Sequence, residues 1–78
     1  MGSFKKITES TVLSPKMKIR RPTISVYYYD YYIIGNLVPG LDKFEVYPEG
    51  DDYLDSHNIF FYYSKQEMIA KNFEYRED

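Results

Sequence analysis

The segment from Thr23 to Ile34 constrains the fold of this chain more than any other stretch. Every residue in it except Asp30 is β-branched, aromatic or serine, which is the composition of a β-strand. Side chains alternate along a strand, so one face would carry Tyr27, Tyr29 and Tyr31 and the opposite face the even-numbered residues. Neither face is polar throughout. Both faces of this strand therefore need a covering element or a partner.

The following segments predict further strands joined by turns. Gly35-Asn36 suits a type II′ hairpin turn, after which Leu37-Val38 would begin the return strand. Pro39-Gly40 suits the two central positions of a type II turn. Alternation predicts a strand over residues 43–47, and a run of apolar residues predicts another over residues 58–63.

A helix is expected near the C-terminal end of the sequence. Ser64 and Glu67 have the spacing of a capping box, in which each side chain accepts a hydrogen bond from the other residue's backbone N–H. The helix would run from Lys65 to about Arg76. Its inner stripe would consist of Ile69, Ala70 and Phe73, with Met68 beside it. We therefore expect an α+β fold, with a small, mainly antiparallel sheet of three to four strands and one C-terminal α-helix packed on one face.

A chain of 78 residues forms one domain with a small core. It has no cysteine, which excludes disulfides and thiolate metal sites, so its ten tyrosines and five phenylalanines are expected to supply much of the core. Residues 1–22 show no sustained period and contain Pro15 and Pro22. We expect a basic N-terminal arm there, partly irregular or with one short strand, followed by a compact domain over residues 23–78.

The formal net charge of −2 hides an asymmetry along the chain. Residues 1–30 carry six lysines and arginines against two acids, a net charge of +4, whereas residues 31–78 carry four against ten, a net charge of −6. Two interpretations remain open. Either the two halves fold onto each other and neutralise locally, or each sign of charge faces a different partner.

The tyrosine-rich strand indicates a binding surface for a protein. Tyrosine is enriched at interfaces because its ring buries a large area at little entropic cost while its hydroxyl makes a directed hydrogen bond. We predict that Tyr27, Tyr29 and Tyr31 contact the partner and that an acidic rim assists them. The rim residues are Asp51, Asp52 and Asp55. In the alternative structural interpretation, the tyrosines form the core and Asp30 prevents edge-to-edge aggregation.

A nucleic-acid-binding module is the second interpretation. Its cations would contact phosphates while unpaired bases stack on the tyrosine rings. The candidate cations are Lys16, Lys18, Arg20 and Arg21. However, the chain lacks the Lys/Arg-Gly-Phe/Tyr-Gly pattern of an RNA-recognition sheet, and its net acidic charge opposes binding to a polyanion. In a third interpretation, the acidic rim imitates phosphates and occupies a basic site on a nucleic-acid enzyme.

Catalysis and metal binding are not expected. His57 is the single histidine, and a catalytic arrangement would need Asp52 or Asp55 beside it on one loop, which would not be preorganised. The spacing of Asp51, Asp52, Asp55 and His57 also lacks the glycine-containing ligand ladder of a calcium loop. We therefore predict a protein that is not an enzyme and has no cofactor and no metal.

The sequence as a whole predicts a small binding protein that acts by stoichiometric protein–protein interaction. A second copy in a homodimer is one such partner, because two small sheets could share a core. Richness in Tyr, Ile, Lys, Phe and Asn is typical of AT-rich genomes, which suggests an inhibitor or modulator of a host protein from a phage or mobile element. No apolar run approaches the roughly 18 to 20 residues of a membrane span, and the N-terminus lacks the apolar segment of a secretory signal, so we expect a cytoplasmic location and no membrane partner.

Overall fold

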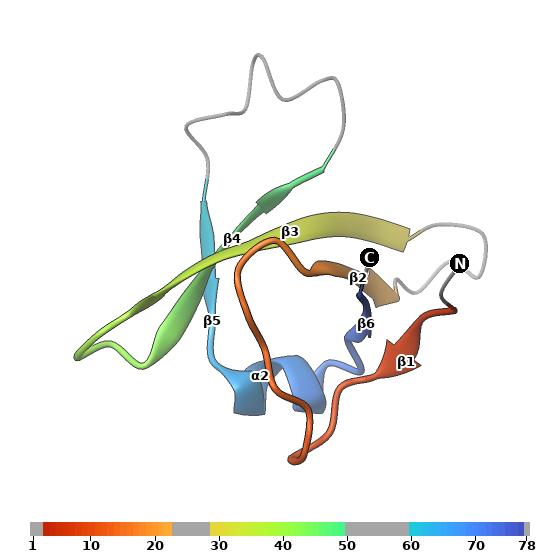
Figure 1. Ribbon diagram of the computed structural model, residues 1–78, viewed down its shortest axis with the longest axis horizontal. Coiled ribbons are helices and arrows are strands. Elements are labelled where there is room, and N and C mark those ends of the chain that lie inside the picture. Colours follow the sequence, from red (N-terminus) through yellow and green to blue (C-terminus); the bar gives the residue numbers. More distant parts are fainter. Residues whose placement is uncertain (1–2, 23–28, 50–59, 78) are drawn as a thin grey trace.

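The computed structural model describes residues 3–22, 29–49 and 60–77, which form one antiparallel sheet and a short helix (Figure 1). The strands described are β1 (Lys5–Lys6), β2 (Lys18–Pro22), β3 (Tyr29–Val38), β4 (Lys43–Pro48), β5 (Phe61–Tyr63) and β6 (Glu74–Arg76). Helix α2 (Lys65–Ala70) lies between β5 and β6 along the chain. The expected α+β class is confirmed in this broad sense.

The order of strands in the sheet is β1-β6-β2-β3-β4-β5, and all neighbours are antiparallel. Strand β2 pairs with β3 over five residue pairs and with β6 over three. Ile19 in β2 therefore lies between Tyr32 of β3 and Tyr75 of β6. This arrangement places β6, from the end of the chain, between β1 and β2, from its beginning.

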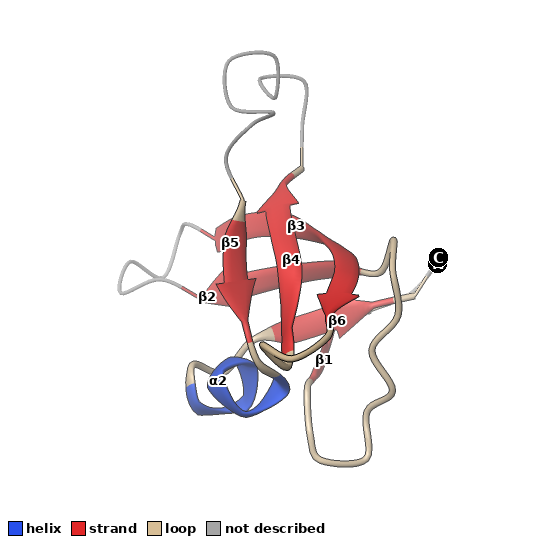
Figure 2. Cartoon of the chain, turned by 90° about the vertical axis from the view of Figure 1, so that its left-hand side faces the viewer, coloured by secondary structure: helices blue, strands red, loops and turns tan. Residues whose placement is uncertain are grey.

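The core lies on one face of the sheet, and helix α2 lies at one end of the strands (Figure 2). The buried apolar residues of the core come from all parts of the described chain. They are Ile7, Met17, Ile19, Tyr32, Ile34, Val46, Met68 and Phe73. The Tyr32 ring stacks on Phe73 at 6.4 Å between centroids, and Tyr63 meets the same phenylalanine edge-on at 5.0 Å. Aromatic packing thus contributes to the core, as the composition predicts.

Residues 3–22 contribute two strands to the sheet, whereas the sequence predicts at most one short strand within the first 22 residues. Together with β6, these strands raise the number from the expected three or four to six in the part of the chain that the structure describes. The prediction was wrong because β1 and β6 have only two and three residues. Such short strands are too brief to show an alternating pattern. Of the strand expected over residues 58–63, Phe61–Tyr63 is β5, and residues 58 and 59 lie outside the described residues.

The expected hairpin turn at Gly35-Asn36 is absent, because this pair forms a β-bulge inside β3. Ile34 pairs with Val46 and Leu37 with Phe44, so β3 has one residue more than β4 between these pairs. The φ angle that a type II′ turn requires is positive, and Gly35 does not adopt one. A Cβ at Gly35 would lie 3.2 Å from the Cβ of Glu45. The glycine at position 35 therefore allows β3 and β4 to approach each other closely.

The chain reverses instead at Pro39-Gly40, as the sequence predicts. The Leu41 N–H donates to the Val38 carbonyl at 3.2 Å, and Gly40 has a φ of +87°, as a type II turn requires. The return strand β4 then buries Val46 and packs the half-buried Phe44 against the core, in the orientation expected from its alternation.

Helix α2 begins as predicted but ends six residues earlier than expected, at Ala70. The capping box is present, with the Glu67 N–H donating to Ser64 Oγ at 3.1 Å and the Ser64 N–H donating to Glu67 Oε1 at 2.8 Å. Asn72 ends the helix by adopting a φ of +62°, and the Phe73 N–H donates to the Met68 carbonyl at 2.9 Å. This Schellman-type end buries Phe73 and directs the next residues into β6, so no helix extends to the C-terminal residues described.

The turn geometry predicts a specific effect for substitutions at Gly40. A Cβ there meets no atom within 4 Å, so Gly40→Ala affects stability through the backbone alone. We expect a loss of about 1 kcal/mol in the free energy of unfolding, because alanine disfavours a positive φ. Gly40→Asn should lose less, since asparagine tolerates this region. Urea denaturation checks this, and equal losses for the two variants would contradict the assigned turn.

The capping box predicts a pH dependence of stability. The backbone N–H of Ser64, and to a smaller extent Lys43 with its Nζ 3.4 Å from Glu67 Oε1, hold the pKa of Glu67 below its ordinary value. The lowered pKa in the folded state means that this carboxylate stabilises the protein above about pH 4.5, and that the contribution is lost as the pH falls through the lowered pKa.

The variant Glu67→Gln should therefore be less stable than the wild type at pH 7 and approach it in acid. Glutamine keeps the acceptor oxygen of the capping box, so the difference between the two proteins reports the charge. Thermal unfolding followed by circular dichroism at several pH values measures this convergence. A stability difference that stays constant with pH would show that the charge of Glu67 does not contribute.

Candidate partner-binding face

The sheet has a second face opposite the core, which we call the outer face. Because Ile19, Tyr32, Ile34 and Val46 are buried, alternation places their strand neighbours on this side. The strand register confirms the arrangement, with Arg20 opposite Tyr31 and opposite Glu74. The described strand residues of the outer face include Lys6, Lys18, Arg20, Pro22, Tyr31, Ile33, Glu45, Tyr47, Tyr62, Glu74 and Arg76.

Large aromatic side chains are exposed along the outer face. Tyr31 is 45% exposed and Tyr62 is 44% exposed. Phe60, which precedes β5, packs edge-on against Tyr47 with 5.8 Å between the ring centroids. Phe4, which precedes β1, lies 6.1 Å from the Tyr31 ring. Aromatic rings therefore reach both the β2–β3 side and the β4–β5 side of this face.

Two guanidinium groups hold Phe4 on the outer face. The Cζ atom of Arg20 lies 4.1 Å from the centroid of the Phe4 ring, and that of Arg76 lies 5.2 Å from it. Both distances are within the range of cation–π attraction. Arg20 also donates from Nε to Glu74 Oε1 at 2.6 Å, which joins β2 to β6 by a charged hydrogen bond. The ring, the two cations and the carboxylate thus connect the two ends of the chain.

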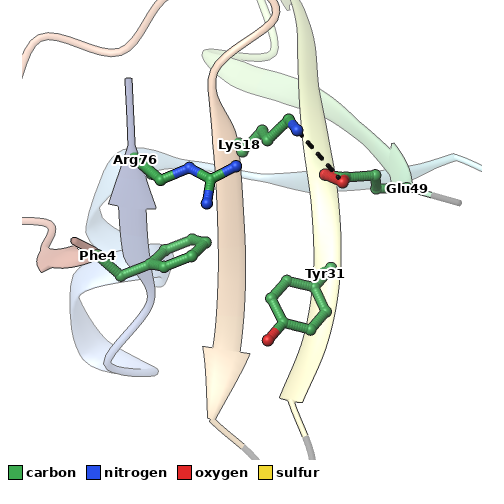
Figure 3. Close-up of a pocket in the computed structure, with 5 residues that line it drawn as sticks. All are labelled: Phe4, Lys18, Tyr31, Glu49 and Arg76. Atoms are coloured by element: carbon green, nitrogen blue, oxygen red, sulfur yellow. Dashed lines mark ion pairs between the residues drawn. The ribbon is translucent and has the colours of Figure 1, made fainter. Parts of the chain in front are cut away.

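A hollow of about 240 Å³ opens between these groups (Figure 3). It is lined by Phe4, Lys18, Tyr31, Glu49 and Arg76. An ion pair between Lys18 Nζ and Glu49 Oε2, at 3.6 Å, lies along it. In Figure 3 the two cationic side chains lie on one side of the hollow and the two aromatic rings on the other. The hollow therefore combines a charged wall with an aromatic wall.

The structure places one of the three predicted tyrosines, Tyr31, on the outer face. Tyr29 belongs to β3 and pairs with Pro22, and its side chain lies outside what the structure describes. Tyr27 lies outside the described residues. The acidic rim predicted at Asp51, Asp52 and Asp55 lies outside them as well. The roles of Tyr27, Tyr29, Asp51, Asp52 and Asp55 therefore stay predictions.

The four predicted cations do not share one surface. Lys18 and Arg20 lie on the outer face, whereas Lys16 occupies the turn before β2 with a φ of +75°. Arg21 lies on the core side of the sheet. It donates to Asp30 Oδ2 at 2.6 Å and, from its other terminal nitrogen, to the Tyr63 hydroxyl at 3.1 Å. Successive side chains of a strand point to opposite faces of the sheet. Arg20 and Arg21 are neighbours in sequence and therefore lie on opposite faces.

The contacts of Arg21 and Tyr32 indicate a structural role for both. The hydrogen bond to Asp30 raises the pKa of Arg21, and burial raises the pKa of Tyr32 to about 12. The Arg21 Cζ atom lies 5.8 Å from the centre of the Tyr32 ring. Tyr32 therefore stays protonated near neutral pH and serves as a core residue.

Sequence reasoning did not identify Phe4, Glu49, Glu74 or Arg76 as site residues. Each of them is remote in sequence from the tyrosine-rich strand. Glu74 and Arg76 reach it through the pairing of β2 with β3 and β6, Phe4 through the pairing of β1 with β6, and Glu49 through the pairing of β4 with β3. The one signal in the sequence is the opposite charge of the two halves, which permits contacts such as Arg20–Glu74. It does not specify which residues pair.

Three further findings bear on function. Within the parts of the chain that the structure describes, no helix has the length and apolar character needed to cross a membrane. Those same residues contain no group of three His, Asp or Glu side chains arranged to hold a metal ion. The chain matches no protein-family model, no curated protein and no solved structure.

The ion pairs Arg20–Glu74 and Lys18–Glu49 of the outer face should differ in coupling energy. Arg20–Glu74 is shorter and its side chains are less exposed, at 23% and 21%, than those of Lys18–Glu49, at 31% and 33%. A double-mutant cycle with Arg20→Gln and Glu74→Gln should give a coupling of about 1 kcal/mol. The matched cycle with Lys18→Gln and Glu49→Gln should give less than about 0.5 kcal/mol. Equal couplings in urea denaturation would contradict this ranking.

Proposed function

We propose that this protein is a non-catalytic binding module that associates stoichiometrically with another protein through the outer face of its sheet. The observation that supports the proposal is the exposure of Tyr31 on β3. This strand is paired with β2 on one side and with β4 on the other. A tyrosine in this position stands on a rigid support. Its burial by a partner would gain apolar area while ordering only two side-chain torsions.

The surroundings of Tyr31 support a protein partner. Tyr47, Phe60 and Tyr62 extend the aromatic area toward β5, and Lys18, Glu49 and Arg76 add charges of both signs beside it. Mixed aromatic and charged surfaces of this kind are typical of protein interfaces, with rings providing most of the binding energy.

Nucleic-acid binding receives less support from the same face. The two carboxylates Glu49 and Glu74 lie within 3.6 Å of Lys18 and 2.6 Å of Arg20, respectively. A polyanion would have to displace or tolerate both carboxylates, on a protein whose formal net charge is already −2. We therefore do not propose nucleic-acid binding as the function of this face.

The proposal predicts that Tyr31→Ser abolishes partner binding without unfolding the protein. Tagged wild type should retain one protein from a lysate of the source organism in a fixed ratio, and the Tyr31→Ser variant should lose it. Val12→Ser is the control, because Val12 is 80% exposed and lies in the connection between β1 and β2, outside the strands that form the outer face. It should retain the same protein.

The control measurement is the stability and mass of each variant. Urea denaturation should show that Tyr31→Ser changes stability by less than about 1 kcal/mol, since Tyr31 is 45% exposed and does not belong to the buried core. Light scattering over a range of concentrations should show a monomer. A dimer whose aromatic residues are buried against a second copy, with no protein retained from the lysate, would contradict a role in binding another protein.

A further inference from the structure

Glu45 is a half-buried carboxylate on the outer face, in the interior of β4. Its Oε1 atom lies 3.3 Å from the point that a Cβ at Gly35 would occupy, so the side chain lies over the β-bulge of β3. Within the described ranges 3–22, 29–49 and 60–77, Glu45 forms no ion pair. Because folding has already removed part of its hydration, this carboxylate gains from an ion pair with an incoming cation.

Aromatic rings lie beside Glu45 on the outer face. Tyr62 of β5 is directly opposite Glu45 in the strand register and is 44% exposed. Side chains that are paired in this way are close enough to interact with the same group. Tyr47 lies two residues further along β4 on the same face, and its ring meets Phe60 edge-on. A cation bound by Glu45 can therefore also reach the exposed Tyr62 ring, to whose face it is attracted.

The position of β5 gives a partner access to this carboxylate. In the described sheet, β5 forms one edge and β1 the other (Figure 2). Strand β1 consists of the exposed Lys5 and Lys6, and lysines at an edge oppose both the addition of a strand and the approach of a basic segment. Strand β5 instead exposes Phe61 and Tyr62. A basic segment is therefore favoured at the β5 side of the outer face.

We infer that Glu45 and Tyr62 receive an arginine side chain from a basic segment of the partner protein. This inference rests on the proposed function, because it names the chemistry by which the outer face recognises its partner. The guanidinium donates hydrogen bonds to the Glu45 carboxylate, and its flat face packs on the Tyr62 ring. Arginine suits the site better than lysine, because its planar group forms two parallel hydrogen bonds with a carboxylate and stacks on aromatic rings.

A basic protein segment fits this part of the outer face better than a nucleic-acid strand. The Glu45 carboxylate repels the phosphates of a strand, and the formal net charge of the protein, −2, adds to this repulsion. The same charges attract a basic segment and favour its encounter with the protein. The charge and the rings together therefore indicate a protein partner with an exposed arginine.

The test uses two matched peptides and amide chemical shifts of the full chain at low salt. The probes are the acetylated, amidated tetrapeptide Ser-Arg-Phe-Ser and the same peptide with citrulline, a neutral isostere, in place of arginine. The arginine peptide should shift the signals of Glu45, Tyr47 and Tyr62 with about millimolar affinity. The citrulline peptide should bind about tenfold more weakly, because it lacks the charge. Equal affinities for the wild-type protein would overturn the inference.

Substitutions at the site should weaken binding of the arginine peptide. Glu45→Gln keeps the size of the side chain over Gly35 and removes its charge, so the affinity should fall about tenfold. Tyr62→Ser removes the ring and should lower the affinity about threefold. Glu77→Gln is the matched control, because it removes the charge of an exposed glutamate beyond β6, and it should leave the affinity unchanged.

The control separates a local site from the overall charge of the protein. Equal weakening by Glu45→Gln and Glu77→Gln would show that only the net charge attracts the peptide, which would overturn the inference. Urea denaturation of each variant checks that it is folded. Single-stranded oligothymidylate that shifts the signals of Glu45 and Tyr62 more strongly than the arginine peptide would also overturn it, in favour of nucleic-acid binding.

Capture of the protein partner from a lysate separates this inference from the proposed function. If Tyr31→Ser loses the partner while Glu45→Gln retains it fully, the arginine site is wrong and the binding face stands. If Glu45→Gln loses the partner and Tyr31→Ser retains it, the role proposed for Tyr31 is wrong and the arginine site stands. If neither variant loses the partner, both proposals are wrong.

Discussion

The pairing of β2 on both of its edges is the constraint on which the rest of the structure depends. Its backbone hydrogen-bonds to β3 on one side and to β6 on the other, so residues far apart in sequence become neighbours. Ile19 is fully buried between Tyr32 and Tyr75 on the core side. Without this strand, β1 and β6 would have no connection to β3, and the core would lose the residues that the N-terminal segment supplies.

The same pairing assembles the outer face. Because β2 lies between β6 and β3, Arg20 stands between Glu74 and the exposed Tyr31, and Lys18 stands between Arg76 and Ile33. The Arg20–Glu74 and Lys18–Glu49 pairs join the two oppositely charged halves, which agrees with the interpretation that the halves neutralise locally. Phe4 then covers part of the sheet and forms one wall of the hollow. The core and the outer face therefore both depend on the pairing of β2.

The sequence predicted those elements that have a local physical signature. The β-branched and aromatic composition identified β3, Pro39-Gly40 identified the turn, and Ser64 with Glu67 identified the start of α2. The sequence did not predict the features that depend on tertiary contacts. The strands β1 and β6 are too short for a pattern, and Gly35 serves a close approach to Glu45 that exists only once β4 is paired.

The end of α2 was missed although the sequence carries a weak signal for it. Asn72 is a residue type that adopts the left-handed conformation, and Phe73 follows as the apolar residue of a Schellman motif. For the candidate site, alternation placed Tyr31 correctly relative to Tyr32. The stack of Phe4 with Arg20 and Arg76 could not be predicted, because it requires the three-dimensional register of β2 and β6.

Site-specific photo-crosslinking tests the central claim, that the outer face contacts a protein partner, most directly. Tyr31→p-benzoylphenylalanine places the reactive ring on this face, and the same substitution at Val12 places it in the connection between β1 and β2. After irradiation in a lysate of the source organism, the account predicts one discrete crosslinked protein from position 31 and none from position 12. A crosslink from position 12 alone would contradict it.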